Sequence, residues 1–232
     1  LPGRGGRSGV TSPCSPSGPG NGKGSGPGRG LRPGSDPSGI VSSGFPGPST
    51  GGLLTNPRVW QRAARRSRGR LLVPSGAVSG LDGLKAMASG GDLRRIQLTT
   101  RKPPQAFAGS PYIRARRIRL DAIRAPRVLF EGSARQAIKA FPQNVNVAAT
   151  LTLAGLTAAP RFKAVVPVSV RIIADPALRT NQHEIEIDGG CGRIRTTIES
   201  RPSSTNPKTS ELAIRSAVAA LRQYFEPVRI GT

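Results

Sequence analysis

The sequence is poor in the residue types that mark several common classes of protein. Aromatic side chains make up 4% of its 232 residues, and histidine occurs once, at position 183. So few aromatics leave little surface on which unpaired bases can stack, as they do in proteins that bind single-stranded nucleic acid. The sequence also lacks a run of about 18 apolar residues and an apolar signal-peptide core. We therefore expect no membrane partner and a cytoplasmic location.

Cysteines and acidic residues are scarce too. Cys14 and Cys191 lie far apart, which excludes a disulfide framework and gives no C-x-x-C spacing, so we predict no metal site. Asp and Glu number 12 against 35 Lys and Arg, a formal charge of +23. Such a charge suggests a nucleic-acid-binding protein. Because most of the basic residues are arginines scattered along the chain, we expect no nucleic-acid partner and keep this function only as an alternative.

Residues 1–56 form a low-complexity segment. Residues 1–52 are mainly Gly, Pro, Ser and Arg, and their apolar residues show no periodicity. A segment that cannot bury apolar side chains does not offset the chain entropy lost on folding. We expect this segment to be disordered, as a tail or linker.

The remaining residues alternate between two hydrophobic periods. Alternating or β-branched runs predict strands, and apolar residues three and four apart predict helices. The predicted strands are 70–73, 95–100, 127–131, 168–174, 183–188 and 193–198, and the predicted helices are 58–70, 77–88, 133–140, 145–155 and 211–224. In the last helix we expect Leu212, Ala213, Ala217, Ala220 and Leu221 on the inner face and Asn206 or Thr209 at the N-cap. This order indicates an α/β fold, a mixed sheet covered by helices.

His183 begins a strictly alternating run. His183, Ile185 and Ile187 share one face of the predicted strand, and Glu184 and Glu186 share the other. The histidine is therefore expected to point toward the core. A histidine in this position can be a satisfied structural residue, or a group that handles protons near neutral pH.

Two asparagines stand at the start of an apolar run. Asn144 is placed to cap the helix that follows. Asn146 lies about 200° further around that helix and does not share the task. Its carboxamide is free to pair with another buried amide, such as that of a nicotinamide ring, or with a neighbouring backbone group. A turn earlier in the chain is expected to leave N–H groups free at Gly76 and Ala77.

Seven short motifs occur in a fixed order. They are PSGAVSGLD (74–82), RKPP (101–104), FEG (130–132), FPQNVNVAA (141–149), ADP (174–176), NQH (181–183) and NPKTS (206–210). Their order and spacing closely resemble the L-aspartate dehydrogenase family over residues 69–232.

The resemblance implies a function, an organisation and a site. Members of this family use NAD or NADP to oxidise L-aspartate through iminoaspartate to oxaloacetate and ammonia, in connection with NAD biosynthesis. Residues 57–80 would be a remnant of the dinucleotide-binding domain, and residues 81–232 the C-terminal domain, with its last helix returning toward the cofactor domain. We expect a homodimer. The implied catalytic residue is His183, the cofactor contacts are Ala77, Asn144 and Asn146, and the substrate contacts are Lys102, Lys208 and Thr209.

One departure from the family concerns the nucleotide. Family members begin with a Rossmann half that carries G-x-G-x-x-G after its first strand, and residues 1–52 contain no such spacing. We expect the chain as given to bind NAD weakly or not at all. The segment is interpreted either as a genuine tail or as a frame slip in GC-rich DNA. The protein would then be an active dehydrogenase or an inactive remnant of one.

Overall fold

The computed structural model describes residues 53–54, 57–159, 165–204, 209–228 and 230–231, which all belong to one compact unit. The predictions for residues 1–52, and for Asn206 and Lys208, lie outside the described residues.

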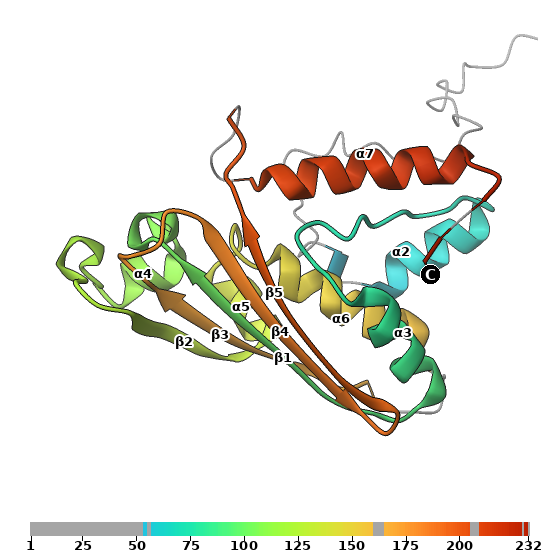
Figure 1. Cartoon of the computed structure of the whole chain (residues 1–232), viewed down its shortest axis with the longest axis horizontal. Helices are drawn as coiled ribbons and strands as arrows, with labels where there is room; N and C mark the ends of the chain where they lie inside the picture. The colour runs from blue at the N-terminus through green and yellow to red at the C-terminus, as the bar shows by residue number, and fades with distance from the viewer. Residues whose placement is uncertain (1–52, 55–56, 160–164, 205–208, 229, 232) are drawn as a thin grey trace, which may run out of the picture. The chain divides into compact units, whose positions relative to one another are not determined.

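A five-stranded mixed sheet forms the centre of the fold (Figure 1). Its spatial order is β2-β3-β1-β4-β5, in which β1 pairs parallel to β3 and every other neighbouring pair is antiparallel. The strands are β1 (Leu93–Lys102), β2 (Arg127–Ser133), β3 (Val168–Ala174), β4 (Asn181–Gly189) and β5 (Gly192–Ser200). The predicted mixed sheet is confirmed. A hairpin joins β4 to β5, and Gly189 pairs with Gly192 at its turn.

Helices cover one face of this sheet. The helix α3 (Leu81–Gly90) packs on α6 (Asn146–Ala158), while α5 (Ala134–Ala140) packs on β2 and β3. Between them lies one continuous apolar core to which the alternate residues of β1, β3 and β4 contribute. Fully buried members are Leu84, Ile96, Leu98, Leu151, Ile172, Ile185 and Ile187. The alternation of apolar residues is what turns this face of each strand inward.

Local signals explain where α5 begins. The Ser133 hydroxyl accepts a hydrogen bond from the Gln136 backbone N–H, and the Gln136 side chain accepts one from the Ser133 N–H. This reciprocal pair is a capping box, which satisfies two backbone donors that a helix start leaves free. The strand β2 therefore passes directly into a helix at Ser133.

The remaining elements are short helices and one long one. They are α2 (Pro57–Arg66), the 3-10 helices η1 (Pro104–Phe107) and η2 (Leu120–Ala122), α4 (Pro111–Ala115) and α7 (Glu211–Phe225). The stretch 104–122 after β1, which contains four arginines, thus folds into η1, α4 and η2. No helix in the described part of the chain is long and apolar enough to cross a membrane.

Two predictions about these elements are wrong. Residues 70–73 form no strand, and Leu71 and Leu72 are exposed, because no described strand lies beside them to supply a hydrogen-bonded partner. In α7, Leu212 and Leu221 are exposed as well. Ala217 is exposed too, whereas Ala213 and Ala220 are half-buried as predicted, together with Ser216 and Tyr224.

Candidate active site

A cavity of about 170 Å³ lies where one end of the sheet meets the starts of two helices. The end of β1, the start of β4, the first turns of α6 and α7 and the loop at 74–77 form its wall. Every predicted site residue that the structure describes lines this cavity: Ala77, Lys102, Asn144, Asn146, His183 and Thr209. Residues separated by more than 130 positions in the sequence are therefore brought to one place.

His183 is buried on the inner face of β4, as the alternation predicts, with 4% of its surface exposed. It lies directly opposite Thr100 in the β1–β4 register, and the Thr100 Oγ1 and His183 Nδ1 atoms are 3.0 Å apart. Burial, and then the nearby charge of Lys102, lower the pKa of His183 from 6.5 to about 3. Burial thus moves the pKa of this histidine below neutrality, a shift that the sequence could not indicate because it gives no measure of desolvation.

Lys102 ends β1 on the same inner face, two residues after Thr100, and is 7% exposed. Its Nζ donates a hydrogen bond to Asn144 Oδ1 at 3.0 Å. Burial lowers the pKa of Lys102 to about 8. Lys102 forms no ion pair with any described residue. The cavity thus contains a buried cation whose charge is compensated only by an amide dipole.

Asn144 does not cap α6, contrary to the prediction. The N-cap residue is Val145, and it forms no side-chain cap hydrogen bond. The Asn144 carboxamide instead accepts from Lys102, and its Nδ2 lies 3.4 Å from the Ala106 carbonyl oxygen, to which it donates. A charged donor is a stronger partner for the Oδ1 atom than a backbone N–H, which explains the choice.

Asn146 begins α6 and is exposed to the cavity. Within the described residues its carboxamide has no hydrogen-bond partner, and it is exposed, whereas the sequence suggested a buried amide. The two asparagine side chains therefore have different surroundings. Asn144 accepts a hydrogen bond from Lys102, whereas the Asn146 carboxamide is unpaired among the described residues and lies at the cavity.

The loop at 74–77 behaves only partly as expected. The Gly76 N–H donates to Ser216 Oγ on α7 at 2.9 Å, so it is not free as predicted. Ala77 is buried at the cavity wall. On the other side, Thr209 contributes to the wall but does not cap α7. The N-cap is Ser210, whose Oγ accepts from the Ala213 N–H.

Sequence reasoning missed two residues of the site. The Thr100 hydroxyl is hydrogen-bonded to His183. Asn181, two residues before His183 and on the same face of β4, lines the cavity. A signal for both is present in the sequence. Positions i and i+2 of a strand share a face, so Thr100 accompanies Lys102 and Asn181 accompanies His183.

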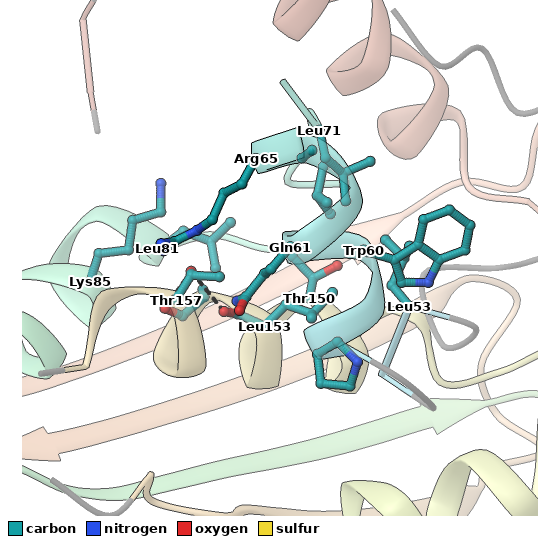
Figure 2. Close-up of a pocket in the computed structure, with 14 residues that line it drawn as sticks. Leu53, Trp60, Gln61, Arg65, Leu71, Leu81, Lys85, Thr150, Leu153 and Thr157 are labelled. Carbon is teal, nitrogen blue, oxygen red and sulfur yellow. Dashed lines mark hydrogen bonds between the residues drawn. The ribbon is translucent and has the colours of Figure 1, made fainter. Parts of the chain in front are cut away.

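A second cavity, of about 440 Å³, lies between α2, α3, α6 and the stretch at 71–73 (Figure 2). Its wall is mainly apolar and includes Trp60, Leu71, Leu81 and Leu153. Thr150 of α6 lines both cavities, but none of the predicted site residues lies in this one. In the parts of the chain that the structure describes, no cluster of His, Cys, Asp and Glu could hold a metal ion.

A known protein family matches the part of the chain that forms most of this site. The family model of the aspartate dehydrogenase C-terminal domain matches residues 82–224. The chain belongs to the aspartate dehydrogenase family. The match includes Lys102, Asn144, Asn146, His183 and Thr209, whereas Ala77 lies just ahead of it.

Individual relatives in this family agree. The chain is 47% identical to an L-aspartate dehydrogenase of Methanosarcina barkeri over 171 residues, which are 74% of this chain and 60% of that protein. It is 39% identical to L-aspartate dehydrogenase 3 of Bordetella bronchiseptica, over 79% of this chain and 64% of that protein. The chain thus spans about three fifths of the length of the curated relatives it matches.

A solved structure of this family has the same fold. The crystal structure of aspartate dehydrogenase from Thermotoga maritima is 27% identical in sequence and superposes with a TM-score of 0.58. The match covers 79% of this chain and 66% of that one. The similarity supports the predicted fold of a dehydrogenase substrate domain.

Proposed function

We propose that this chain is the substrate-binding part of an L-aspartate dehydrogenase that depends on NAD or NADP. The reaction oxidises L-aspartate to iminoaspartate, which water converts to oxaloacetate and ammonia. The observation that carries the proposal is the cavity in which Lys102, Asn146 and His183 meet, in a chain of this family.

The chemistry of the cavity wall fits a dicarboxylate. Lys102 and His183 are its only titratable side chains among the described residues, and no Asp or Glu lines it. A buried ammonium without a carboxylate partner destabilises the free protein. A substrate carboxylate would supply that partner, so Lys102 is proposed to bind one carboxylate of L-aspartate. The Thr209 region and Lys208 are proposed to contact the other.

The residues present also fit the nicotinamide end of a cofactor. The unpaired carboxamide of Asn146 matches, donor to acceptor, the carboxamide of a nicotinamide ring, and Ala77 lies at the same cavity wall. When bound, the nicotinamide accepts the hydride that leaves the substrate Cα. The contribution of the protein is to hold the two reactants at near-contact distance. Asn144 is proposed to act on the site through Lys102, to which it is hydrogen-bonded.

His183 is proposed as the catalytic residue. It lines the same cavity as Lys102 and Asn146, and its ring is held from the sheet side by Thr100. The Nε2 atom has no hydrogen-bond partner among the described residues, which leaves it for the substrate.

The test joins residues 57–232 to the nucleotide-binding half expected in the Methanosarcina barkeri relative; we call this fusion the joined protein. We expect reduction of NAD or NADP that depends on L-aspartate and is absent with L-alanine, which lacks the second carboxylate. The same assay with each nucleotide decides the cofactor preference. A folded joined protein that shows no activity with L-aspartate would identify an inactive remnant.

A homodimer and a cytoplasmic location remain predictions. Sedimentation of the purified chain at several concentrations tests the first, and a monomer at all of them would contradict it. Fractionation of cells that express the chain tests the second.

A further inference from the structure

A threonine in the core of the sheet, rather than a carboxylate, holds the histidine of the candidate site. Thr100 and His183 are 2% and 4% exposed, and their side chains meet at 3.0 Å. For a neutral imidazole this contact has two forms. Either the Thr100 hydroxyl donates to Nδ1, or a protonated Nδ1 donates to the hydroxyl oxygen.

Burial distinguishes the two forms. The Thr100 hydroxyl has no hydrogen-bond partner other than His183 among the described residues. If Nδ1 carried the proton, the hydroxyl proton would be left in the core without an acceptor. An unpaired buried donor costs roughly 1–3 kcal/mol. If the hydroxyl donates instead, its proton is hydrogen-bonded to Nδ1, and the ring proton is on Nε2, where the cavity that His183 lines leaves room for water or a ligand to accept it.

We propose that Thr100 is a positioning residue that fixes neutral His183 in the tautomer with its proton on Nε2. His183 then meets the substrate as a hydrogen-bond donor and not as a base. The catalytic meaning of this tautomer rests on the proposed function, whereas the tautomer itself does not.

The charged groups around the ring agree with a neutral histidine. Lys102, from the end of β1, is the only other titratable group of the described cavity wall, and its positive charge disfavours a second cation. On the outer face of the same strands, Glu184 pairs with Arg101. Asp175 follows the end of β3, and its backbone N–H donates to the Lys102 carbonyl oxygen. Its carboxylate Oδ1 accepts a hydrogen bond from the Ala177 N–H. Among the residues that the structure describes, no carboxylate lines the cavity beside the ring to favour the protonated form.

A ligand oxygen is the partner that this tautomer suits. The Nε2–H group can donate to a carboxylate of L-aspartate or to the oxygen of a carbonyl product, but it has no lone pair with which to accept a proton. Because the ring is held on the sheet side, the donor direction is set before the substrate binds. This arrangement avoids a reorientation of the ring during the reaction.

The test uses the full chain, because His183 is its only histidine. The protein is labelled with ¹⁵N in the imidazole ring and purified with a tag that contains no histidine. Long-range ¹H–¹⁵N spectra at neutral pH then report one ring. We expect Nδ1 to resonate as an unprotonated, pyridine-type nitrogen and Nε2 as a protonated, pyrrole-type nitrogen. Protonated Nδ1 in the wild-type chain would overturn the proposal without any variant.

Two variants show whether Thr100 is the cause. Thr100→Val keeps the branched shape but removes the hydroxyl, and it should move both ring nitrogens toward the averaged shifts of mixed tautomers. Thr100→Ser keeps the hydroxyl and should retain the wild-type pattern. An unchanged pattern in a folded Val variant would show that the hydroxyl does not select the tautomer. If the tautomer is found but the joined protein does not oxidise L-aspartate, the proposed function fails and this inference stands.

Discussion

Charged side chains have different surroundings on the two faces of the central sheet. On the outer face, Arg95 and Arg101 pair with Glu186 and Glu184 across β1 and β4, at 3.1 and 3.3 Å. On the inner face of the same strands, Lys102 and His183 are buried, and their side-chain partners among the described residues are one amide and one hydroxyl. Arg101 and Lys102 are neighbours in sequence, so one step along the chain separates the two environments.

The difference shows what each face is suited to do. Exposed ion pairs are screened by water and contribute little individually. A buried cation without a counter-ion costs stability, and it is retained here at the wall of a cavity. A site of this kind gains interaction energy when an anion enters, because the ligand supplies the missing charge.

The largest expected effect comes from the inner face. In the joined protein, His183→Ala should lower the turnover of L-aspartate by about 10²–10³, the usual effect of removing one positioned hydrogen-bond donor. Gln182→Ala is the matched control, since the Gln182 side chain lies on the outer face and bonds Glu199. If His183→Ala melts the domain while the folded fraction keeps full turnover, the histidine is structural.

The second-largest expected effect is a pH dependence of the unfolding free energy that is caused by Lys102. The pKa of Lys102 is about 8 in the folded chain against an ordinary value of 10.5. Between these two values the unfolded chain binds the additional proton, so the unfolding free energy should rise with pH across that window, by about 3 kcal/mol. Lys102→Met should remove the rise and stabilise the chain at pH 7.

Urea unfolding followed by circular dichroism at a series of pH values measures this. Lys139→Met is the control, because Lys139 is an exposed lysine on α5. A Lys102→Met variant whose unfolding free energy keeps the wild-type dependence between pH 8 and 10.5 would show that this lysine is hydrated in the folded state.

A smaller effect should separate the two asparagines. Asn146→Ala removes the free carboxamide and should weaken the binding of NAD to the joined protein by roughly 2–10-fold, the size of one lost hydrogen bond. Thr157→Ala, at the other end of the same helix, should leave it unchanged. Titration calorimetry measures both. Equal affinity in the Asn146 variant would remove this residue from the cofactor site.

The smallest effect belongs to the outer face. Glu186 lies between Arg95 and Arg195, within 3.1 and 3.4 Å. Glu186→Gln should cost less than about 1 kcal/mol of unfolding free energy, and the cost should shrink as salt is added. A loss as large as that expected for the buried groups would mean that the two faces do not differ as described.

Much of the fold could be predicted from hydrophobic period alone. The strand 168–174 was predicted with the bounds of β3, and the alternation from His183 to Asp188 turned the histidine inward in β4. These signals are local, because a strand that buries one face must alternate. The strand predicted at 70–73 was wrong because a strand also needs a second strand to which it can hydrogen-bond. The hydrophobic period of a segment does not indicate whether such a partner strand exists.

The site was predictable in its members but not in its contacts. Motif order pointed to Ala77, Asn146 and His183, and all three line the cavity. The sequence did not indicate that Asn144 would bond Lys102 rather than cap α6, or that Ser216 of α7 would take the Gly76 N–H. These partners are 42 and 140 residues apart, and only chain topology brings them together.

The sequence by itself determined which side of the alternating strands faces the core, and hence that His183 shares a face with Ile185 and Ile187. It did not show that Lys102, beyond the predicted strand 95–100, would be buried on the same face. Only the tertiary structure decided their chemistry. It placed Thr100 against Nδ1, put Asn144 against Nζ, and brought no carboxylate of the described residues to the cavity wall. The physical reason is that a pKa depends on desolvation and on the charges in three dimensions around the group. Residue spacing along the chain records neither.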